Sequence, residues 1–294
     1  MDQRCPGFAQ EYTEAMITAE QKEKERCLRA YLCAAERVVV AFSGGVDSTY
    51  LLKVAHDELS TNALAVTSVS CLVPANEHDD ARKFCDQEGI ELVVRETAPL
   101  EVPGFAGNSP ERCYLCKTSL LVEFKELARA RGISLVLDGS NIDDLGDFRP
   151  GLRAVHEQGV ESPLIECGFT KVDIRACARE LGLKAWDKPS AACLASRIAS
   201  GEEITPERLA RIDAAEQYLH GLGIRQVRVR LLRGGLPGDE LARIEADEEG
   251  RTLLLSSPGS LALAIAYLLK LGFAAVEPEV ALYHSGSMNP ASAL

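Results

Sequence analysis

The string Ser43-Gly44-Gly45-Val46-Asp47-Ser48 constrains this chain most, because it joins an apolar β-branched run to a segment with a helical pattern. A strand, a turn rich in serine and glycine, and a helix in this order form a site for anions. Glycine lets the backbone approach a phosphate, and the N–H groups and dipole at a helix start favour negative charge. An ordinary strand-to-helix turn is the plainer interpretation, but the full string favours nucleotide binding. No GxxxxGK string occurs, so γ-phosphate transfer is not expected.

Length and charge limit the classes of protein to consider. The 294 residues allow one large or two modest domains. No apolar run is long enough to cross a membrane, and residues 1–25 lack the apolar core of a signal peptide, so we expect a cytoplasmic protein without a membrane partner. The net charge of −12 argues against a nucleic-acid partner, which would need basic surface.

Apolar runs alternate with helical patterns over the first two thirds of the chain. Strands are expected at 38–42, 63–69, 90–94 and 135–137, and helices at 13–36, 51–59, 77–88, 118–131 and 170–181. Continuously apolar strands between helices predict an α/β fold, a Rossmann-like parallel sheet with helices on both faces. Ligands of such sheets bind at the carboxyl ends of the strands.

The pattern changes near residue 200. Helices are expected at 206–219 and 260–271, and strands at 226–232, 241–245 and 273–276. This order predicts a small α+β domain with an antiparallel pair of strands. We therefore predict two domains, 1–200 with an N-terminal helical segment at 1–36, and 201–294.

Ten cysteines are many for a cytosolic protein, where disulfides are not expected and metal or thiol chemistry is more common. Four cysteines are expected to be structural and to serve as small hydrophobic side chains: Cys27, Cys33, Cys71 and Cys177. Cys113 and Cys116 form a CxxC pair, which we place in a loop that leads into a helix. The pair suits a metal or an iron–sulfur cluster if a further ligand comes from elsewhere, and an accidental pair is the alternative.

Cys193 lies in a loop between two cations, Lys188 and Arg197. Nearby cations lower the pKa of a thiol and favour the nucleophilic thiolate, so this cysteine is a candidate nucleophile. A buried structural cysteine among small residues is the alternative.

Charged residues at strand ends suggest further contacts with a nucleotide. Asp47 could bind Mg²⁺ beside the phosphates, or only complement the helix dipole. Asp138 and Asp144 follow the 135–137 strand and could also hold Mg²⁺, although a solvated loop explains Asp144 nearly as well. Arg228 and Arg230 share one face of a strand, which suggests either a bound phosphate or carboxylate partners.

Seven strings resemble the LarE family of PP-loop proteins. In order they are SGGVDS, ERCYLCK, DGSNIDDLGDFRPGLRA, WDKPSAACLASRI, RQVRVR, LARIE and YHSGSMN, which span nearly the whole chain. Only the first is shared widely with other PP-loop ATP pyrophosphatases, which cut ATP to AMP and pyrophosphate. The resemblance implies a sulfur transferase of the synthesis of the nickel-pincer nucleotide, the cofactor of lactate racemase.

The resemblance also implies a reaction. ATP adenylates a carboxylate of a pyridinium dicarboxylate mononucleotide, and a sulfur nucleophile displaces AMP to give a thiocarboxylate; a second cycle converts the other carboxylate. Family members are similar in forming hexamers, and a sulfide donor is expected as a partner. ATP and Mg²⁺ would bind at the PP-loop, through Ser43, Gly44, Gly45, Asp47 and Ser48.

The cysteines carry the sulfur step in this resemblance. Cys193 matches the family cysteine that can give up its own sulfur and become dehydroalanine. A subgroup that this chain resembles also has Cys113 and Cys116, and its three thiolates hold a 4Fe-4S cluster whose fourth iron carries an extra sulfide. We expect this version here.

Other positions match the family pattern. Lys117 and Arg197 are candidate contacts of substrate or phosphate. Arg228 and Arg230 match phosphate-binding arginines, while Glu216 and Glu245 match acidic positions that bind divalent metal and are also the carboxylates with which these arginines could pair. A longer loop at 233–238 replaces a short turn of the family.

Three other classes remain open at this point. A PP-loop tRNA thiolase would share the chemistry, but the acidic charge argues against it. A synthetase of the NAD or GMP type, in which ammonia attacks the adenylate, would not need the three cysteines. A nucleotide-sensing protein or a zinc-stabilised module would need a fourth zinc ligand.

Overall fold

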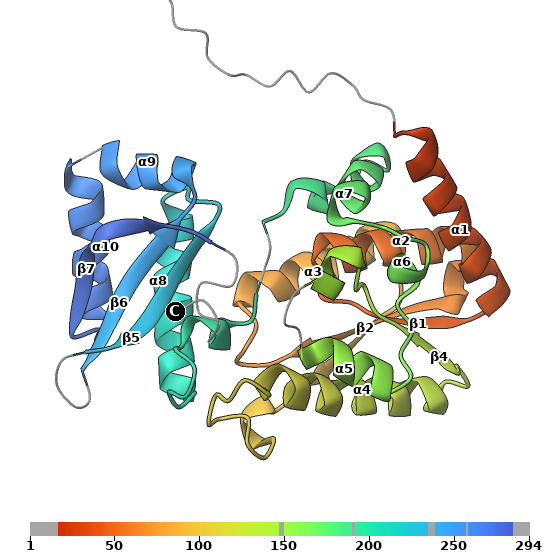
Figure 1. Ribbon diagram of the computed structural model, residues 1–294, viewed down its shortest axis with the longest axis horizontal. Coiled ribbons are helices and arrows are strands. Elements are labelled where there is room, and N and C mark those ends of the chain that lie inside the picture. Colours follow the sequence, from red (N-terminus) through yellow and green to blue (C-terminus); the bar gives the residue numbers. More distant parts are fainter. Residues whose placement is uncertain (1–16, 147–149, 190–191, 235–238, 257, 285–294) are drawn as a thin grey trace, which may run out of the picture.

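The computed structural model describes residues 17–146, 150–189, 192–234, 239–256 and 258–284. These residues form two sheets, which lie in two separate lobes of the ribbon (Figure 1). One sheet has four strands in the order β3-β2-β1-β4, and the other has three strands in the order β5-β6-β7.

The four-stranded sheet is parallel throughout, as predicted. Alternate side chains of its central strand point to opposite faces, because Val38 and Val40 join one hydrophobic cluster and Val39 joins another. Helices α1, α2, α3, α6 and α7 lie on the first face, and α4 and α5 on the second (Figure 1). The elements are β1 (Val38–Ala41), β2 (Ala63–Val69), β3 (Leu92–Glu96), β4 (Leu135–Leu137), α1 (Ala19–Ala35), α2 (Val46–Leu59), α3 (Ala75–Glu88), α4 (Arg112–Ala130), α5 (Pro150–Glu157), α6 (Pro163–Glu166) and α7 (Lys171–Glu180).

The second sheet contains the predicted antiparallel pair, β5 with β6, and β7 runs parallel to β6. Its elements are α8 (Pro206–Gly221), β5 (Val227–Arg233), β6 (Glu240–Ala246), α9 (Glu248–Ser256), α10 (Pro258–Lys270) and β7 (Ala275–Leu282). Sequence patterns missed α9 and all of β7 after Val276. The domain boundary at residue 200 stays a prediction.

The start of α4 differs from the prediction. The helix begins at Arg112, six positions before the expected start at 118, so Cys113 and Cys116 lie within its first five residues and not in a loop. The Gly/Pro-rich stretch at 103–110 suggested a loop, but a proline just before a helix is compatible with a helix start. The short helices α5 and α6 were also missed.

One expectation about cysteine is wrong. Cys27 of α1 and Cys167 at the end of α6 form a disulfide, with Cα atoms 5.7 Å apart. The two positions are 140 residues apart, so no local pattern could reveal that α1 packs on α6. Seven other described cysteines are free thiols.

Within the described ranges, no single helix is long and apolar enough to cross a membrane. One strongly bent pair, Glu248–Ser256 with Gly259–Lys270, reaches the same threshold by length and composition only.

Candidate functional site

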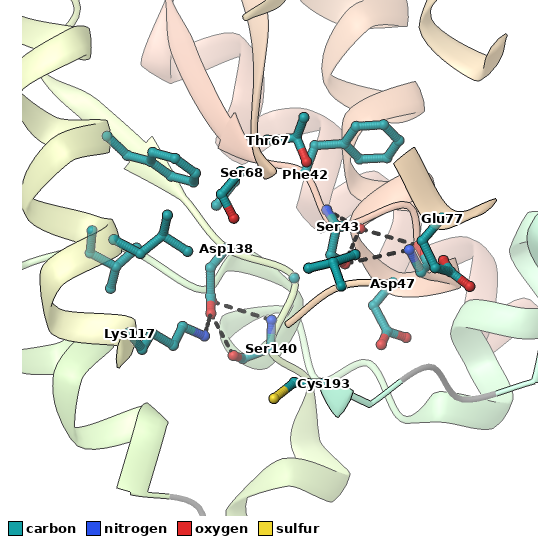
Figure 2. A pocket seen from close by; sticks show the side chains of 18 of the residues that line it. Phe42, Ser43, Asp47, Thr67, Ser68, Glu77, Lys117, Asp138, Ser140 and Cys193 are labelled. Carbon is teal, nitrogen blue, oxygen red and sulfur yellow. Dashed lines mark hydrogen bonds and ion pairs between the residues drawn. The ribbon is translucent and has the colours of Figure 1, made fainter. Parts of the chain in front are cut away.

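A cavity of 490 Å³ opens at the carboxyl ends of β1, β2 and β4 (Figure 2). This nucleotide cavity, as we call it below, lies where a parallel sheet is expected to bind its ligand. The turn between β1 and α2 forms one wall, and the segment after β4 forms another. Its predicted site residues are Ser43, Gly45, Asp47, Ser48, Lys117, Asp138, Asp144 and Cys193.

The turn at the start of α2 has the geometry of an anion site. Gly44 has φ +72°, a conformation that favours glycine, and Gly45 is the N-cap and provides no side-chain cap. The hydroxyl oxygens of Ser43 and Ser48 lie 3.0 Å apart, and the Ser48 hydroxyl donates to the Gly45 carbonyl over 3.2 Å. Backbone N–H groups at this helix start can therefore bind phosphate oxygens.

Gly139 lets the segment after β4 approach this turn. A Cβ atom on Gly139 would lie 2.9 Å from the Ser48 backbone nitrogen, closer than real contacts allow. Only glycine therefore fits between β4 and the start of α2.

Replacement of Gly139 by alanine is expected to displace the PP-loop and raise the KM for ATP by roughly 10-fold or more, since overpacking costs about 1–3 kcal/mol. The matched control is Gly146→Ala, because a Cβ there meets nothing within 4 Å. ATP titration of both variants measures the difference. Equal affinities would show that the close approach of Gly139 is not required.

Asp47 has one oxygen paired and one without a partner. Its Oδ2 lies 2.5 Å from Nζ of Lys171, whereas Oδ1 is buried and has no hydrogen-bond partner among the described residues. Burial raises the pKa of Asp47, although Lys171 opposes that shift. A buried carboxylate oxygen without a partner, in a cavity suited to phosphates, fits a hard divalent cation such as Mg²⁺. Sequence reasoning missed Lys171.

Lys117 is held in the cavity by Asp138. Its Nζ lies 2.8 Å from Asp138 Oδ2, and the Ser140 hydroxyl donates to the same carboxylate (Figure 2). The Ser162 hydroxyl also donates to Asp138. Burial alone would raise the pKa of Asp138, but Lys117 and the hydroxyls more than offset it and lower the pKa. The carboxylate therefore stays ionised and fixes the Lys117 cation. Asp144 accepts a hydrogen bond from the Asn141 backbone.

A second cavity, of 610 Å³, brings the three predicted cysteines together. Cys113, Cys116 and Cys193 all line it, and we call it the cysteine cavity. Cys193 and Lys117 line both cavities, so the two spaces meet at these side chains. The loop that carries Cys193 is fixed by a 2.8 Å hydrogen bond from the Leu194 N–H to the Leu72 carbonyl.

The cysteine cavity suits a cluster better than a single metal ion. Among the described residues, no group of three His, Cys, Asp or Glu side chains could hold one ion. A cubane cluster has a different requirement, because each thiolate binds a different iron. Three thiols line this cavity, two of them from one helical turn, and thiols are the donors that an iron–sulfur cluster requires.

The expected cause of Cys193 reactivity is wrong. Burial raises the pKa of the Cys193 thiol, and the opposing effects of Arg112 and Arg197 do not overcome it. Lys188 lies 2.8 Å from Glu77 and Arg197 pairs with a carboxylate, so both predicted cations are largely neutralised. Burial likewise raises the pKa of Cys116, to about 12.

Alkylation of Cys193 should therefore speed up as pH rises past the ordinary thiol value of about 8.5. Since a raised pKa leaves little thiolate at neutral pH, the rate at pH 7 should be low. Arg112→Met should slow alkylation further at each pH, because Arg112 opposes the shift. Iodoacetamide rates by peptide mass mapping test this on metal-free protein. A rate that is flat from pH 7 to 10 would mean that the thiol is already ionised.

The two predicted acidic positions, Glu216 on α8 and Glu245 on β6, are paired with arginines. Arg197 bonds Glu216 through Nε and Nη2, at 2.9 and 2.8 Å, and both side chains are almost fully buried. Arg230 lies 2.8 Å from Glu245 on the neighbouring strand. Arg228 lines a third cavity, of 400 Å³, together with Arg197 and Glu216. Binding of divalent metal at Glu216 and Glu245 stays a prediction, and it would have to displace these arginines.

Some parts of the motifs lie outside the described residues. These are positions 147–149, 190–191, 235–238 and 285–289, which include most of the longer loop after β5 and the end of the last string.

The fold and the site define a class: a parallel α/β sheet whose first strand leads through a Ser-Gly-Gly turn into a helix is the nucleotide-binding unit of PP-loop proteins. In agreement, residues 21–135 match the NAD synthase family. One chain of the glutamine-hydrolyzing GMP synthase of Thermoplasma acidophilum is 28% identical over 187 residues, which are 59% of this chain and 60% of that protein.

Two relatives match nearly the whole chain. An uncharacterized protein of Synechocystis is 40% identical over 262 residues, 89% of this chain and 95% of that protein. The pyridinium-3,5-bisthiocarboxylic acid mononucleotide synthase of Lactiplantibacillus plantarum is 36% identical over 269 residues, 90% of this chain and 94% of that enzyme. The chain therefore belongs to the LarE family and is an ATP-dependent sulfurtransferase.

Proposed function

We propose that this enzyme adenylates the carboxylates of pyridinium-3,5-dicarboxylic acid mononucleotide and converts them to thiocarboxylates. One observation carries the proposal: Cys193 and Lys117 line both the nucleotide cavity and the cysteine cavity. An acyl group activated in the first cavity is thus beside the thiols of the second. The relative from L. plantarum is named for the bisthiocarboxylic acid product of such a reaction.

In the first step the carboxylate attacks the α-phosphorus of ATP and pyrophosphate leaves. The N–H groups at the start of α2 hold the phosphates, and Asp47 would hold Mg²⁺, which would supply the positive charge that offsets the charge of the departing pyrophosphate. Lys117, fixed by Asp138, orients the substrate carboxylate. Adenylation is needed because a carboxylate oxygen is a poor leaving group.

In the second step a hydrosulfide attacks the acyl carbon, the bond to AMP breaks, and a thiocarboxylate forms. Cys113, Cys116 and Cys193 would hold a 4Fe-4S cluster, which would supply the sulfide for this attack. Leu72, Phe105 and neighbouring apolar side chains line the cysteine cavity and limit the access of water, which would hydrolyse the adenylate.

A second version of the sulfur step has its own support. Cys193 is the one cysteine of the three that also lines the nucleotide cavity, so its own sulfur could attack the adenylate, expel AMP and form a thioester. Loss of the Cα proton and cleavage of the Cβ–S bond would then release the thiocarboxylate and leave dehydroalanine at this position. In both versions we propose that Arg228 and Arg230 hold the substrate phosphate. We also propose that the protein is a hexamer and is located in the cytoplasm. Its product would serve the synthesis of the lactate racemase cofactor.

The proposal is tested by incubating anaerobically purified protein with ATP, Mg²⁺, sulfide and the dicarboxylate mononucleotide. We expect AMP, pyrophosphate and thiocarboxylate in equal amounts. In parallel reactions, bulk tRNA replaces the mononucleotide as the acceptor, and ammonia replaces sulfide as the nucleophile. Product with either, and none with the mononucleotide, would contradict the proposal.

The cluster is tested separately by measuring iron and acid-labile sulfide. Both should approach four per chain and fall sharply in Cys113→Ala and in Cys193→Ala. Cys33→Ala is the matched control, because Cys33 is an exposed thiol on α1. Iron that is absent from every anaerobic sample would leave Cys193 as a single-use donor.

A further inference from the structure

A fourth thiol lies at the edge of the cysteine cavity. Cys71 is an exposed free thiol in the turn that follows β2. Its two neighbours, Ser70 and Leu72, both line the cavity that contains Cys113, Cys116 and Cys193. The Cys116 thiol also interacts electrostatically with Cys193, Cys113 and Cys71, which places the four thiols near one another.

The turn that carries Cys71 is fixed to the Cys193 loop. The Leu72 carbonyl accepts the 2.8 Å hydrogen bond from the Leu194 N–H. Leu72 is only 4% exposed and belongs to the apolar cluster against which Cys116 and Cys193 pack. The position of Cys71 relative to the sulfur-transfer thiols is therefore set by backbone and core contacts, while its own side chain faces solvent.

We propose that Cys71 accepts sulfane sulfur from a low-molecular-weight persulfide and delivers it to the cysteine cavity. The arrangement suits a relay: the exposed Cys71 thiol can meet a donor in solution, and the half-buried thiols of Cys116 and Cys193 can receive what it releases. The inference rests on the proposed sulfur transfer, but the acceptance step itself needs neither ATP nor a metal cluster.

The chemistry balances without an external oxidant. The Cys71 thiolate attacks the outer sulfur of the donor persulfide, the donor S–S bond breaks, and the donor leaves as a thiolate. A low-molecular-weight thiolate then attacks the Cys71 sulfur, and hydrosulfide leaves with the electron pair. A second thiol reduces the resulting mixed disulfide, so two thiols are oxidised to a disulfide while one sulfane sulfur becomes sulfide.

Cys33 provides a matched control. It is also an exposed free thiol, but it lies on α1, with Sγ 3.2 Å from Glu58 Oε2 and no neighbouring thiol described as its partner. Glu58 raises the pKa of Cys33 through this hydrogen bond, whereas burial raises that of Cys71. If exposure to solvent were the only factor, polysulfide would modify Cys33 and Cys71 to similar extents.

The test treats the full-length protein briefly with inorganic polysulfide, traps persulfides with an alkylating reagent and maps the peptides by mass. We expect occupancy at Cys71 to exceed that at Cys33 on the order of 10-fold. The label at Cys71 should persist in Cys113→Ala. Equal labelling of Cys71 and Cys33 would overturn the proposal.

A turnover experiment completes the test with Cys71→Ser, which keeps the shape of the side chain. With polysulfide and a thiol as the sulfur source, thiocarboxylate formation should fall about 10-fold or more, while iron and acid-labile sulfide stay at the wild-type level. Wild-type turnover of polysulfide in Cys71→Ser would overturn the relay. If no sulfur source yields product, the proposed function fails, and the peptide map still decides the role of Cys71.

Discussion

Cys193→Ser is expected to lower thiocarboxylate formation on the order of 1,000-fold, because removal of a central nucleophilic group has effects of this size or larger. Cys193 lines both cavities, and both proposed versions of the sulfur step use its thiol. Exchange of pyrophosphate into ATP should persist in this variant, since the PP-loop and Lys117 are unchanged. Product is measured by mass spectrometry and exchange with labelled pyrophosphate.

Cys33→Ser is the control for the loss of a free thiol, and it should retain full sulfur transfer. If Cys193→Ser formed product at the wild-type rate, sulfur would not pass through this residue. The mechanism would then be closer to that of the NAD and GMP synthetases, in which a free nucleophile attacks the adenylate.

Arg197→Met is expected to lower the free energy of unfolding by about 3–5 kcal/mol, the usual cost of breaking a buried ion pair on one side. Arg197 is 1% exposed and Glu216 is 3% exposed, and two hydrogen bonds join them. The variant leaves the Glu216 carboxylate buried without its cation. Urea denaturation followed by circular dichroism measures the change.

The double variant Arg197→Met/Glu216→Gln separates the ion pair from the packing. Glutamine removes the buried charge and keeps an oxygen for the Val229 N–H, which lies 2.9 Å from Glu216 Oε1. We expect the double variant to recover about 2 kcal/mol of the loss. Arg26→Met, at a largely exposed pair with Glu23, should change stability by less than about 1 kcal/mol. If Arg197→Met lowered the free energy of unfolding no more than Arg26→Met, the buried ion pair between Arg197 and Glu216 would not stabilise the fold as argued.

Local patterns predicted the parts of this fold that depend on local physics. The apolar β-branched run before Ser43 and the glycines after it were sufficient to place β1, the turn and α2. Continuous apolar strands predicted the parallel sheet, because side chains on both faces of β1 are buried in hydrophobic clusters.

Contacts between distant segments could not be predicted. Lys171 binds Asp47 across 124 positions, and Cys27 reaches Cys167 across 140, and neither pair shares a local pattern. The pKa of Cys193 was misjudged for a related reason: its charged neighbours are visible in the sequence, but its burial is not.

The resemblance to LarE located three cysteines that local reasoning left ambiguous. Cys113 and Cys116 looked like an isolated pair, and Cys193 lies 77 positions beyond Cys116 in the printed sequence. Only the fold brings them to one cavity. Cys71 was grouped with the structural cysteines, because nothing in its local sequence indicates that the turn after β2 meets the Cys193 loop.

The most direct test of the central claim counts product per protein chain. Anaerobic enzyme is given ATP, Mg²⁺, the dicarboxylate mononucleotide and excess sulfide, and thiocarboxylate and intact protein mass are followed together. Sulfur transfer through Cys113, Cys116 and Cys193 predicts many thiocarboxylates per chain with no change in protein mass. Product that stops at one per chain, with loss of one H₂S from Cys193, would contradict cluster-based transfer.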